Sequence, residues 1–281
     1  MTKNRQNTPA SRLENPNGPS GSPTVQNDLQ RIISSPTFRM KHLELKLIDR
    51  YKNRKQETLV SVIMPTWNRR RVIKRAIDSV MAQSYQNYEL IISDDGSTDG
   101  TGDLLLDEYG KVPKLLYLCN EHRGVSYARN SALEKARGQL IAYLDTDNQW
   151  DTNFLMLMVN SLEDVPEKST AYCGIRVINE IRQARFTRLI DYDRMALEKR
   201  NFIDMNIFIH RESLFRRYGG FAHDVEPLED WELILRYTKE NPPLVVNCCL
   251  ANYYIAKEIN HQSLICETDL SYKKIRALYC D

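Results

Sequence analysis

The sequence predicts an α/β fold with a mostly parallel central sheet and a smaller antiparallel region in its second half. Short apolar runs alternate with amphipathic segments between residues 59 and 144. Polar motifs follow three of the apolar runs, at 65–68, 94–97 and 145–147. Such alternation is typical of a parallel sheet, whose ligands bind beyond the carboxyl ends of the strands. We therefore expect one shared site at one rim of the sheet.

The first half is expected to contain four strands and three helices. The apolar runs that predict strands lie at 59–64, 88–93, 115–118 and 140–144. Helices are predicted from apolar stripes at helical spacing over 72–81, 104–109 and 125–136. Asn68 is expected to cap the first helix and Gly138 to end the third, since these residue types favour helix starts and ends, respectively.

The pattern loosens after Trp150. Two β-segments in antiparallel arrangement and three helices are expected there, over 170–179, 183–190, 211–218, 229–239 and 269–279. We expect this half to complete the same compact unit. The predicted organisation is thus a main domain over 59–268 followed by a C-terminal helix over 269–281.

The first 58 residues differ in character from the rest. Residues 1–28 are rich in Asn, Pro, Ser and Gly and poor in apolar side chains, which predicts a disordered tail. Residues 29–58 include a basic amphipathic helix. One interpretation is a helix packed on the main domain with a solvated basic face. The other is peripheral contact of residues 37–56 with an anionic membrane surface.

Composition excludes several classes of protein. Hydrophobic residues make up 42% and charged residues 27%, and the net charge of +2 gives no general case for nucleic acid. The six cysteines form no CxxC pair, which argues against a disulfide framework or a zinc module. No run reaches the roughly 18 to 20 apolar residues of a membrane span. We expect a cytoplasmic protein, with attachment at the inner membrane face as the second interpretation.

A carboxylate pair follows the apolar run that ends at Leu144. Asp145 and Asp147 would lie at the tip of a strand and offer only hard oxygen ligands, which suit Mg²⁺ or Mn²⁺ bound to phosphate. Asp147 is the expected metal ligand, and Asp145 is the alternative holder of sugar or ribose hydroxyls, with Thr146 between them. A solvated loop or a helix cap is the competing interpretation.

Two further motifs predict a nucleotide pocket. Pro65, Thr66 and Asn68 follow the first strand, and Asp94 and Asp95 follow the second. A backbone turn and helix capping explain the same residues without a ligand.

Arg129 lies in the first turns of a predicted helix. Its guanidinium could pair with a diphosphate, and a surface salt bridge is the alternative.

The second half offers a candidate base. Glu229 and Asp230 open a predicted helix, where acidic residues are also favoured by the helix dipole. With Trp231 and Gly220 they are expected on the acceptor side of the site, and Asp230 is the candidate base. His261 is either a further metal ligand or a surface histidine.

Together these motifs resemble the family 2 glycosyltransferases of the GT-A fold. The resemblance spans about residues 59–263, and each motif is weak alone. The segments that carry it, in the order of the family, are Val62–Asn68, Ser93–Asp99, Gly124 with Ala128–Asn130, Leu144–Asp147, Gly219–Phe221 and Glu229–Trp231.

The resemblance implies a Rossmann-like three-layer α/β/α enzyme that inverts the anomeric centre of a nucleotide-diphosphate sugar, such as a UDP-sugar, with Mn²⁺ or Mg²⁺. It implies that Thr66 and Asp95 line the nucleotide pocket, with Arg129 near the nucleotide. It also implies that Asp230 is the base. The acceptor would be a glycan, a lipid-linked or a protein hydroxyl, as in polysaccharide biosynthesis. Two features depart from the family pattern: Trp67 stands where tyrosine is common, and the region just before His261 lacks the arginine that is common some residues before the final serine.

Two other functions compete with this one. The first is a sugar-nucleotide-binding protein without catalysis, against which the presence of Asp147 and Asp230 argues. The second is a sugar nucleotidyltransferase, which would release pyrophosphate from a nucleoside triphosphate. Such enzymes carry a glycine-rich basic loop after the first strand, where this chain has Pro65 to Asn68 and no glycine.

Overall fold

The computed structural model describes residues 35–256 and 268–279. The chain divides into two compact units, Met1–Arg39 and Met40–Asp281. The expected tail at 1–28 and the candidate ligand His261 lie outside the described residues. Within those residues, no helix is long and apolar enough to cross a membrane.

A single sheet of nine strands forms the centre of the large unit. Its order is β3-β2-β1-β4-β8-β6-β9-β5, with β7 paired to β6. The strands of the first half are parallel to one another, as predicted: β1 Val60–Thr66, β2 Tyr88–Asp94, β3 Leu115–Cys119 and β4 Leu140–Tyr143. β1 lies between two neighbours and is buried throughout, which explains its continuous apolar sequence.

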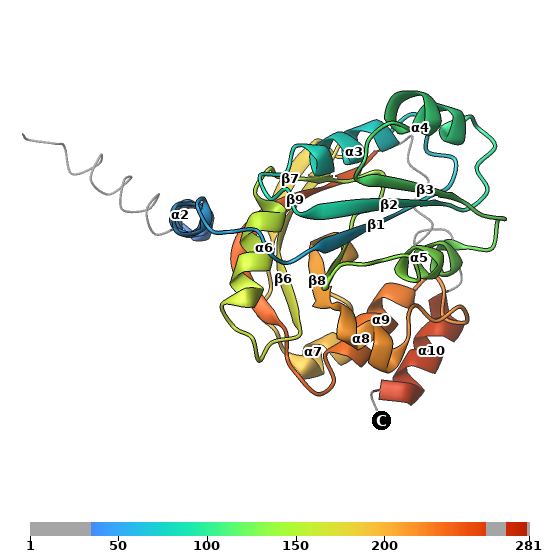
Figure 1. Cartoon of the computed structure of the whole chain (residues 1–281). Helices are drawn as coiled ribbons and strands as arrows, with labels where there is room; N and C mark the ends of the chain where they lie inside the picture. Colours follow the sequence, from blue (N-terminus) through green and yellow to red (C-terminus); the bar gives the residue numbers. More distant parts are fainter. Residues whose placement is uncertain (1–34, 257–267, 280–281) are drawn as a thin grey trace, which may run out of the picture. The chain divides into compact units, whose positions relative to one another are not determined.

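Helices cover both faces of these parallel strands. In Figure 1, α3 (Ile73–Met81) and α4 (Thr101–Tyr109) lie on one face, and α5 (Val125–Leu133) lies on the other. α3 buries its predicted stripe, which consists of Ile73, Ala76, Ile77 and Val80. The α/β class and the layered arrangement expected from the sequence are therefore confirmed.

The second half adds strands of mixed direction. β8 (Phe208–Arg211) is antiparallel to β4 and β6 (Thr170–Asn179), and β6 forms the expected antiparallel hairpin with β7 (Ala184–Arg188). β9 (Leu244–Ile255) runs parallel to β6, and the short β5 (Gln149–Trp150) pairs with β9. The helical elements here are α6 Phe154–Glu163, α7 Arg194–Lys199, the 3₁₀ turn η1 Met205–Ile207, α8 Glu212–Tyr218, α9 Glu229–Tyr237 and α10 Thr268–Tyr279.

Two predicted helix boundaries are wrong. Asn68 does not cap α3, which begins after Val72; its backbone is left-handed (φ 52°) and its side chain accepts a hydrogen bond from the Thr98 N–H instead. Gly138 does not end α5, which stops at Leu133. Gly138 instead permits close contact with β1, because a Cβ there would lie 2.4 Å from the Ser61 nitrogen.

Helix α2 (Pro36–Tyr51) corresponds to the predicted basic helix. Its apolar residues Leu43, Leu47 and Ile48 pack against the core of the large unit, and the Tyr51 hydroxyl donates a 2.8 Å hydrogen bond to Asp164. The packed helix was one of the two interpretations of this segment. The packing leaves little of the apolar stripe available to a bilayer.

Candidate active site

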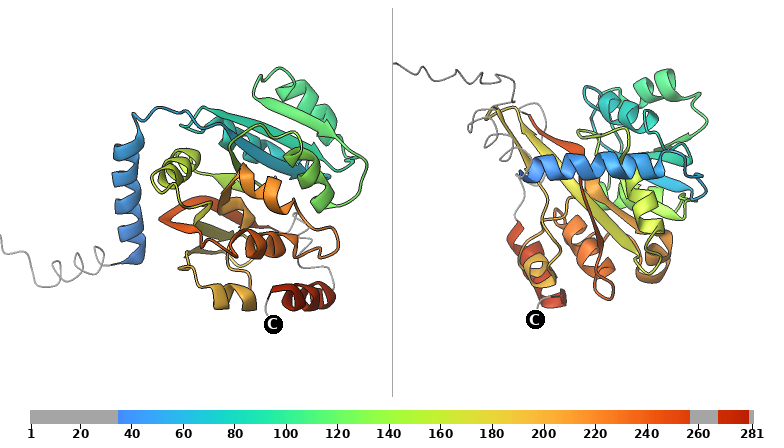
Figure 2. Two further views of the ribbon diagram at one scale, coloured as in Figure 1. Left: turned by 60° about the horizontal axis from the view of Figure 1, so that its bottom comes forward. Right: turned by 90° about the vertical axis from the view of Figure 1, so that its left-hand side faces the viewer.

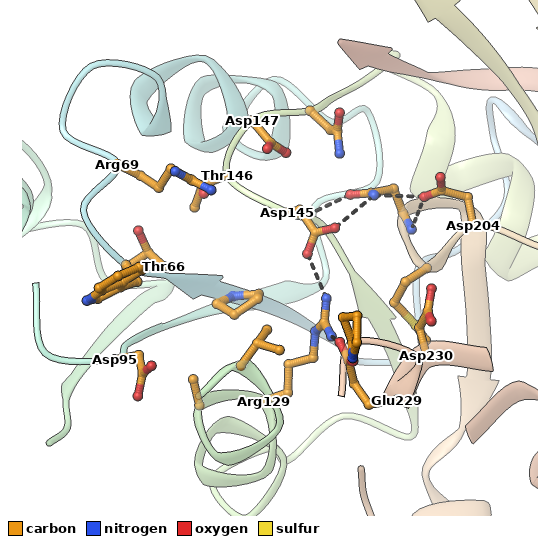
Figure 3. Close-up of a pocket in the computed structure, with 18 of the residues that line it drawn as sticks. Thr66, Arg69, Asp95, Arg129, Asp145, Thr146, Asp147, Asp204, Glu229 and Asp230 are labelled. Carbon is orange, nitrogen blue, oxygen red and sulfur yellow. Dashed lines mark hydrogen bonds and ion pairs between the residues drawn. The ribbon is translucent and has the colours of Figure 1, made fainter. Parts of the chain in front are cut away.

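A cavity of about 390 Å³ opens beyond the carboxyl ends of β1, β2 and β4. Residues far apart in the sequence meet there, and Figure 3 shows their side chains directed toward a common space. Of the residues predicted to form a site, those that line the cavity are Pro65, Thr66, Asp95, Arg129, Asp145, Thr146, Asp147, Glu229 and Asp230.

Arg129 joins two of these carboxylates. From α5, its Nη2 lies 3.0 Å from Asp145 Oδ1 and its Nη1 lies 2.7 Å from Glu229 Oε1. Arg129 and Glu229 are both buried. The guanidinium is therefore not the surface salt bridge considered from the sequence, and its contact with a diphosphate stays a prediction. It connects the end of β4 to the first turn of α9 (Figure 3).

Asn206 holds Asp145 from the other side. Its side-chain oxygen accepts from the Asp145 N–H at 2.7 Å, and its amide nitrogen donates to Asp145 Oδ2 at 3.1 Å. The same amide nitrogen donates to Asp204 Oδ1 at 2.8 Å. Both oxygens of Asp145 thus have protein partners. Nothing in the sequence indicated Asp204 or Asn206, because they follow no recognisable strand; Asp204 caps the 3₁₀ turn η1, and Asn206 lies within it.

Asp147 differs from Asp145 in its surroundings. Among the described residues, no side-chain donor is hydrogen-bonded to its carboxylate, whereas its backbone oxygen accepts from Arg75 at 2.6 Å. Burial and then the charge of Asp145 raise the pKa of Asp147 to about 6, and Arg69 opposes this shift. An open carboxylate beside a second one suits a hard divalent cation, which takes its other ligands from phosphate and water. The donor set therefore fits Mg²⁺ or Mn²⁺.

Asp230 and Glu229 are adjacent but have different partners. Glu229 is paired with Arg129, whereas among the described residues Asp230 accepts hydrogen bonds only from neutral donors, the Asn201 amide at 3.3 Å and the Trp231 N–H at 2.7 Å. Burial and then the charge of Glu229 raise the pKa of Asp230 to about 7. Burial also raises the pKa of the neighbouring Glu229, and Arg129 opposes that shift.

The opposite wall carries the residues predicted to bind a nucleotide. Thr66 ends β1, and its buried hydroxyl has no hydrogen-bond partner among the described residues. The Asp95 carboxylate accepts from the backbone N–H groups of Arg123 and Gly124 at 2.8 and 3.0 Å, and the Asp95 backbone oxygen lies 3.0 Å from His122 Nδ1. The His122 ring stacks on Trp67 with centroids 4.5 Å apart.

Several predicted residues lie outside the cavity. Asp94 is buried and accepts from the Tyr117 hydroxyl and the Ser97 N–H, so it shapes the loop behind Asp95. The side chain of Asn68 accepts a hydrogen bond from the Thr98 N–H of the same loop. The Trp231 indole donates to the Leu197 carbonyl and stacks on Tyr272.

Gly220 also lies away from the cavity. It packs against Asn130, whose Oδ1 would lie 2.1 Å from an added Cβ. As noted above, His261 is outside the described residues, and its role as a metal ligand stays a prediction.

Other cavity residues were not predicted as site residues: Trp67, Arg69, Val125, Ala128, Asn148, Asp204, Met205, Asn206, Glu226, Pro227 and Tyr253. Glu226 accepts from the Ser126 N–H at 2.9 Å, which places a carboxylate at the start of α5. Arg69 could have been suspected, since it follows the Pro65–Asn68 motif directly. Glu226 precedes the Glu229–Asp230 motif by only three residues, yet nothing in its sequence context marks it.

Residues 61–230 match the protein family described as glycosyl transferase family 2. The chain belongs to this family. The matched range contains the cavity residues from Pro65 to Asp230.

Curated relatives agree with this assignment. The chain is 32% identical over 194 residues to the Escherichia coli protein WfgD, with 68% of this chain and 74% of WfgD covered. WfgD is named as a UDP-Glc:α-D-GlcNAc-diphosphoundecaprenol β-1,3-glucosyltransferase. The chain is also 41% identical over 116 residues to TuaG of Bacillus subtilis, which is named for teichuronic acid biosynthesis. This match covers 41% of the present chain and 44% of TuaG.

Solved structures show the same fold. TarS of S. aureus in complex with UDP-GlcNAc has a TM-score of 0.64 at 18% identity, covering 78% of this chain and 65% of that one. The mannosyltransferase PcManGT of Pyrobaculum calidifontis, in complex with GDP-Man and Mn²⁺, has a TM-score of 0.55 at 21% identity, covering 89% and 73%. At these identities the likeness concerns the fold.

Proposed function

We propose that the chain transfers a sugar from a nucleotide-diphosphate donor, a UDP-sugar, to an acceptor hydroxyl with inversion at the anomeric carbon. The observation that carries this proposal is that Asp147 and Asp230 line one cavity. Family membership and the UDP-sugar named for WfgD and for the TarS complex support the donor class.

Asp147 would hold the divalent cation, with Asp145 beside it. The cation would neutralise charge on the leaving diphosphate. The contacts of Asp145 with Arg129 and Asn206 fix the loop that carries Asp147, so the open carboxylate is held in place before the donor binds. Thr66 and Asp95, on the opposite wall, are the proposed contacts of the nucleotide.

Asp230 is the proposed base. The acceptor oxygen attacks the anomeric carbon as the bond from that carbon to the diphosphate oxygen breaks, and the acceptor proton passes to Asp230. Inversion follows because attack and departure occur on opposite faces. Glu229 is the less suitable base, because its ion pair with Arg129 stabilises its charged form, whereas the hydrogen bonds of Asp230 come from neutral donors. A carboxyl with a pKa of about 7 is a better base at neutral pH than an ordinary aspartate.

The proposed acceptor is a lipid-linked glycan of a polysaccharide pathway. Support comes from the diphosphoundecaprenol acceptor in the name of WfgD and from the pathway in the name of TuaG.

The test is release of UDP from UDP-sugars with Mn²⁺, with and without a diphosphate-linked lipid acceptor. Asp230→Asn should lower acceptor-dependent release about 100- to 10,000-fold, the usual contribution of a general base. The matched control is Asp103→Asn, which removes an exposed carboxylate from the first turn of α4 and should change nothing. Full activity of Asp230→Asn would refute the assigned base.

A further inference from the structure

The hairpin of β6 and β7 is an ordered projection with an amphipathic sequence. Asn179 pairs with Ala184, so residues 180–183 form the connecting turn. The Asn179 side chain accepts from the Arg182 N–H at 2.9 Å, and Gln183 adopts a left-handed conformation with φ 51°. The turn is therefore held in one defined geometry.

Apolar and basic side chains are both exposed on this hairpin. Ile181 is 50% and Phe186 54% exposed, which is unusual for large apolar residues that lie so close in sequence. Arg182 and Arg185 are exposed beside them and have no acidic partner among the described residues. Exposed apolar groups next to unpaired arginines are complementary to an anionic lipid interface.

The hairpin is continuous with the wall of the cavity. Phe186 pairs with Val177, and Val177 pairs with Tyr253, which lines the cavity. Paired residues on neighbouring strands project to the same face of a sheet. One apolar row therefore leads from the cavity to the exposed Phe186. Arg188 of β7 also reaches the cavity residue Asp204, at 3.2 Å.

Helix α2, the other basic segment, has a different character. Several cations of α2 or just after it have acidic partners, as in the pairs Lys41–Glu44, Arg50–Asp164 and Lys52–Asp49. Its apolar stripe packs on the core. Phe38 and Leu45 of α2 are nevertheless 42% and 56% exposed, so variants of both segments are compared in the test below.

We propose that the β6–β7 hairpin docks on an anionic lipid surface, with Ile181 and Phe186 entering the interface and Arg182 and Arg185 contacting lipid phosphates. The mouth of the cavity then lies near the headgroup layer, where a lipid-linked acceptor presents its sugar. The proposal goes beyond the proposed function, and docking can be measured without donor or transfer.

The test is co-sedimentation of the full chain with vesicles of phosphatidylcholine, with or without phosphatidylglycerol. Binding should require phosphatidylglycerol and weaken as salt rises. Arg182→Gln with Arg185→Gln should lower the partition coefficient about 25-fold, at about fivefold for each arginine. Ile181→Ser with Phe186→Ser should lower it at least as much.

Matched controls separate the effect of the hairpin residues from a general effect of losing charge or exposed apolar surface. Lys111→Gln with Lys135→Gln removes two exposed charges elsewhere, and Leu106→Ser removes an exposed apolar residue of α4; both should bind as the unmodified chain does. Thermal unfolding of each variant checks that it folds.

Three results would overturn the proposal. The first is no binding to anionic vesicles. The second is a larger loss from Lys41→Gln on α2 with Lys52→Gln just after it than from the hairpin variants. The third is self-association of the chain that the hairpin variants abolish, since this would assign the surface to a second copy.

Discussion

At the scale of single residues, Arg129 explains how the two halves of the cavity are held together. It contacts Asp145 at the end of β4 and Glu229 at the start of α9, residues separated by 84 positions in the numbering of the chain. The sequence predicted an arginine near the nucleotide but could not show this bridge, since no local pattern encodes a contact over such a distance. The same holds for Asn206 and Asp145.

Removing the guanidinium should destabilise the fold. Arg129→Ala leaves the buried Glu229 without its cation, and we expect a loss of about 2–4 kcal/mol in the free energy of unfolding, measured by urea denaturation. Arg216→Ala, which removes an exposed i,i+4 partner of Glu212, should cost no more than about 0.5 kcal/mol. If pairing is the cause, Arg129→Met with Glu229→Gln should be more stable than Arg129→Ala; equal or lower stability would contradict this explanation.

The proton affinity of Asp230 should appear in the pH profile of transfer. Its raised pKa means that the carboxyl binds a proton below about pH 7 and is then unable to accept one from the acceptor. The value of kcat/KM should therefore rise with pH through about 7. Glu229→Gln removes a neighbouring negative charge and should move the profile to lower pH. A profile that does not move, or that moves to higher pH, would show that another group controls it.

At the scale of elements, the sequence was informative where a helix has one buried face or a strand has a continuous apolar run. The stripe of α3 and the parallel strands β1 to β4 lie close to where they were predicted. α6 was missed because its residues are buried almost throughout, so it has no polar face to reveal a helical period. β8 and β9 were missed because polar residues interrupt their apolar runs: β8 has only four residues and ends in His210 and Arg211, and β9 contains Asn247 and Asn252.

A buried histidine on β8 should make the stability of the fold depend on pH. On β8, His210 is fully buried; its Nδ1 lies 2.9 Å from the Arg211 carbonyl oxygen and its Nε2 lies 2.8 Å from the Tyr143 hydroxyl. The neutral ring satisfies both contacts, with Nδ1–H donating and Nε2 accepting. Burial lowers the pKa of His210 to about 4.

The unfolded chain should therefore bind a proton at this histidine before the folded chain does. Stability should fall as pH drops from about 6.5 to 4, by about 3 kcal/mol from this residue alone. His210→Gln should remove that part of the pH dependence, as measured by urea denaturation across this range, whereas His223→Gln, at an exposed position, should retain it. An unchanged pH dependence in His210→Gln would mean that other groups cause the acid sensitivity.

At the scale of the whole molecule, the cavity is assembled from the ends of parallel strands on one side and the first turn of α9 on the other. Because strand ends in a parallel sheet share one rim, the sequence could predict that Thr66, Asp95 and Asp147 would meet. It could not distinguish Asp94 from Asp95, since their opposite orientations depend on Tyr117 and on the loop before α5. Nor could it predict the wall formed by Asp204 and Tyr253.

Donor binding can test the proposed division of the cavity into a donor side at Asp147 and a base side at Asp230. The measurement is the thermal shift produced by UDP-sugars with and without Mn²⁺, since a ligand stabilises the folded state according to its concentration relative to its dissociation constant. Asp147→Ala should lose the Mn²⁺-dependent part of the shift, and Asp230→Asn should keep it while losing transfer. Retention of the shift in Asp147→Ala, or its loss in Asp230→Asn, would contradict the assignment of a donor side and a base side within one cavity.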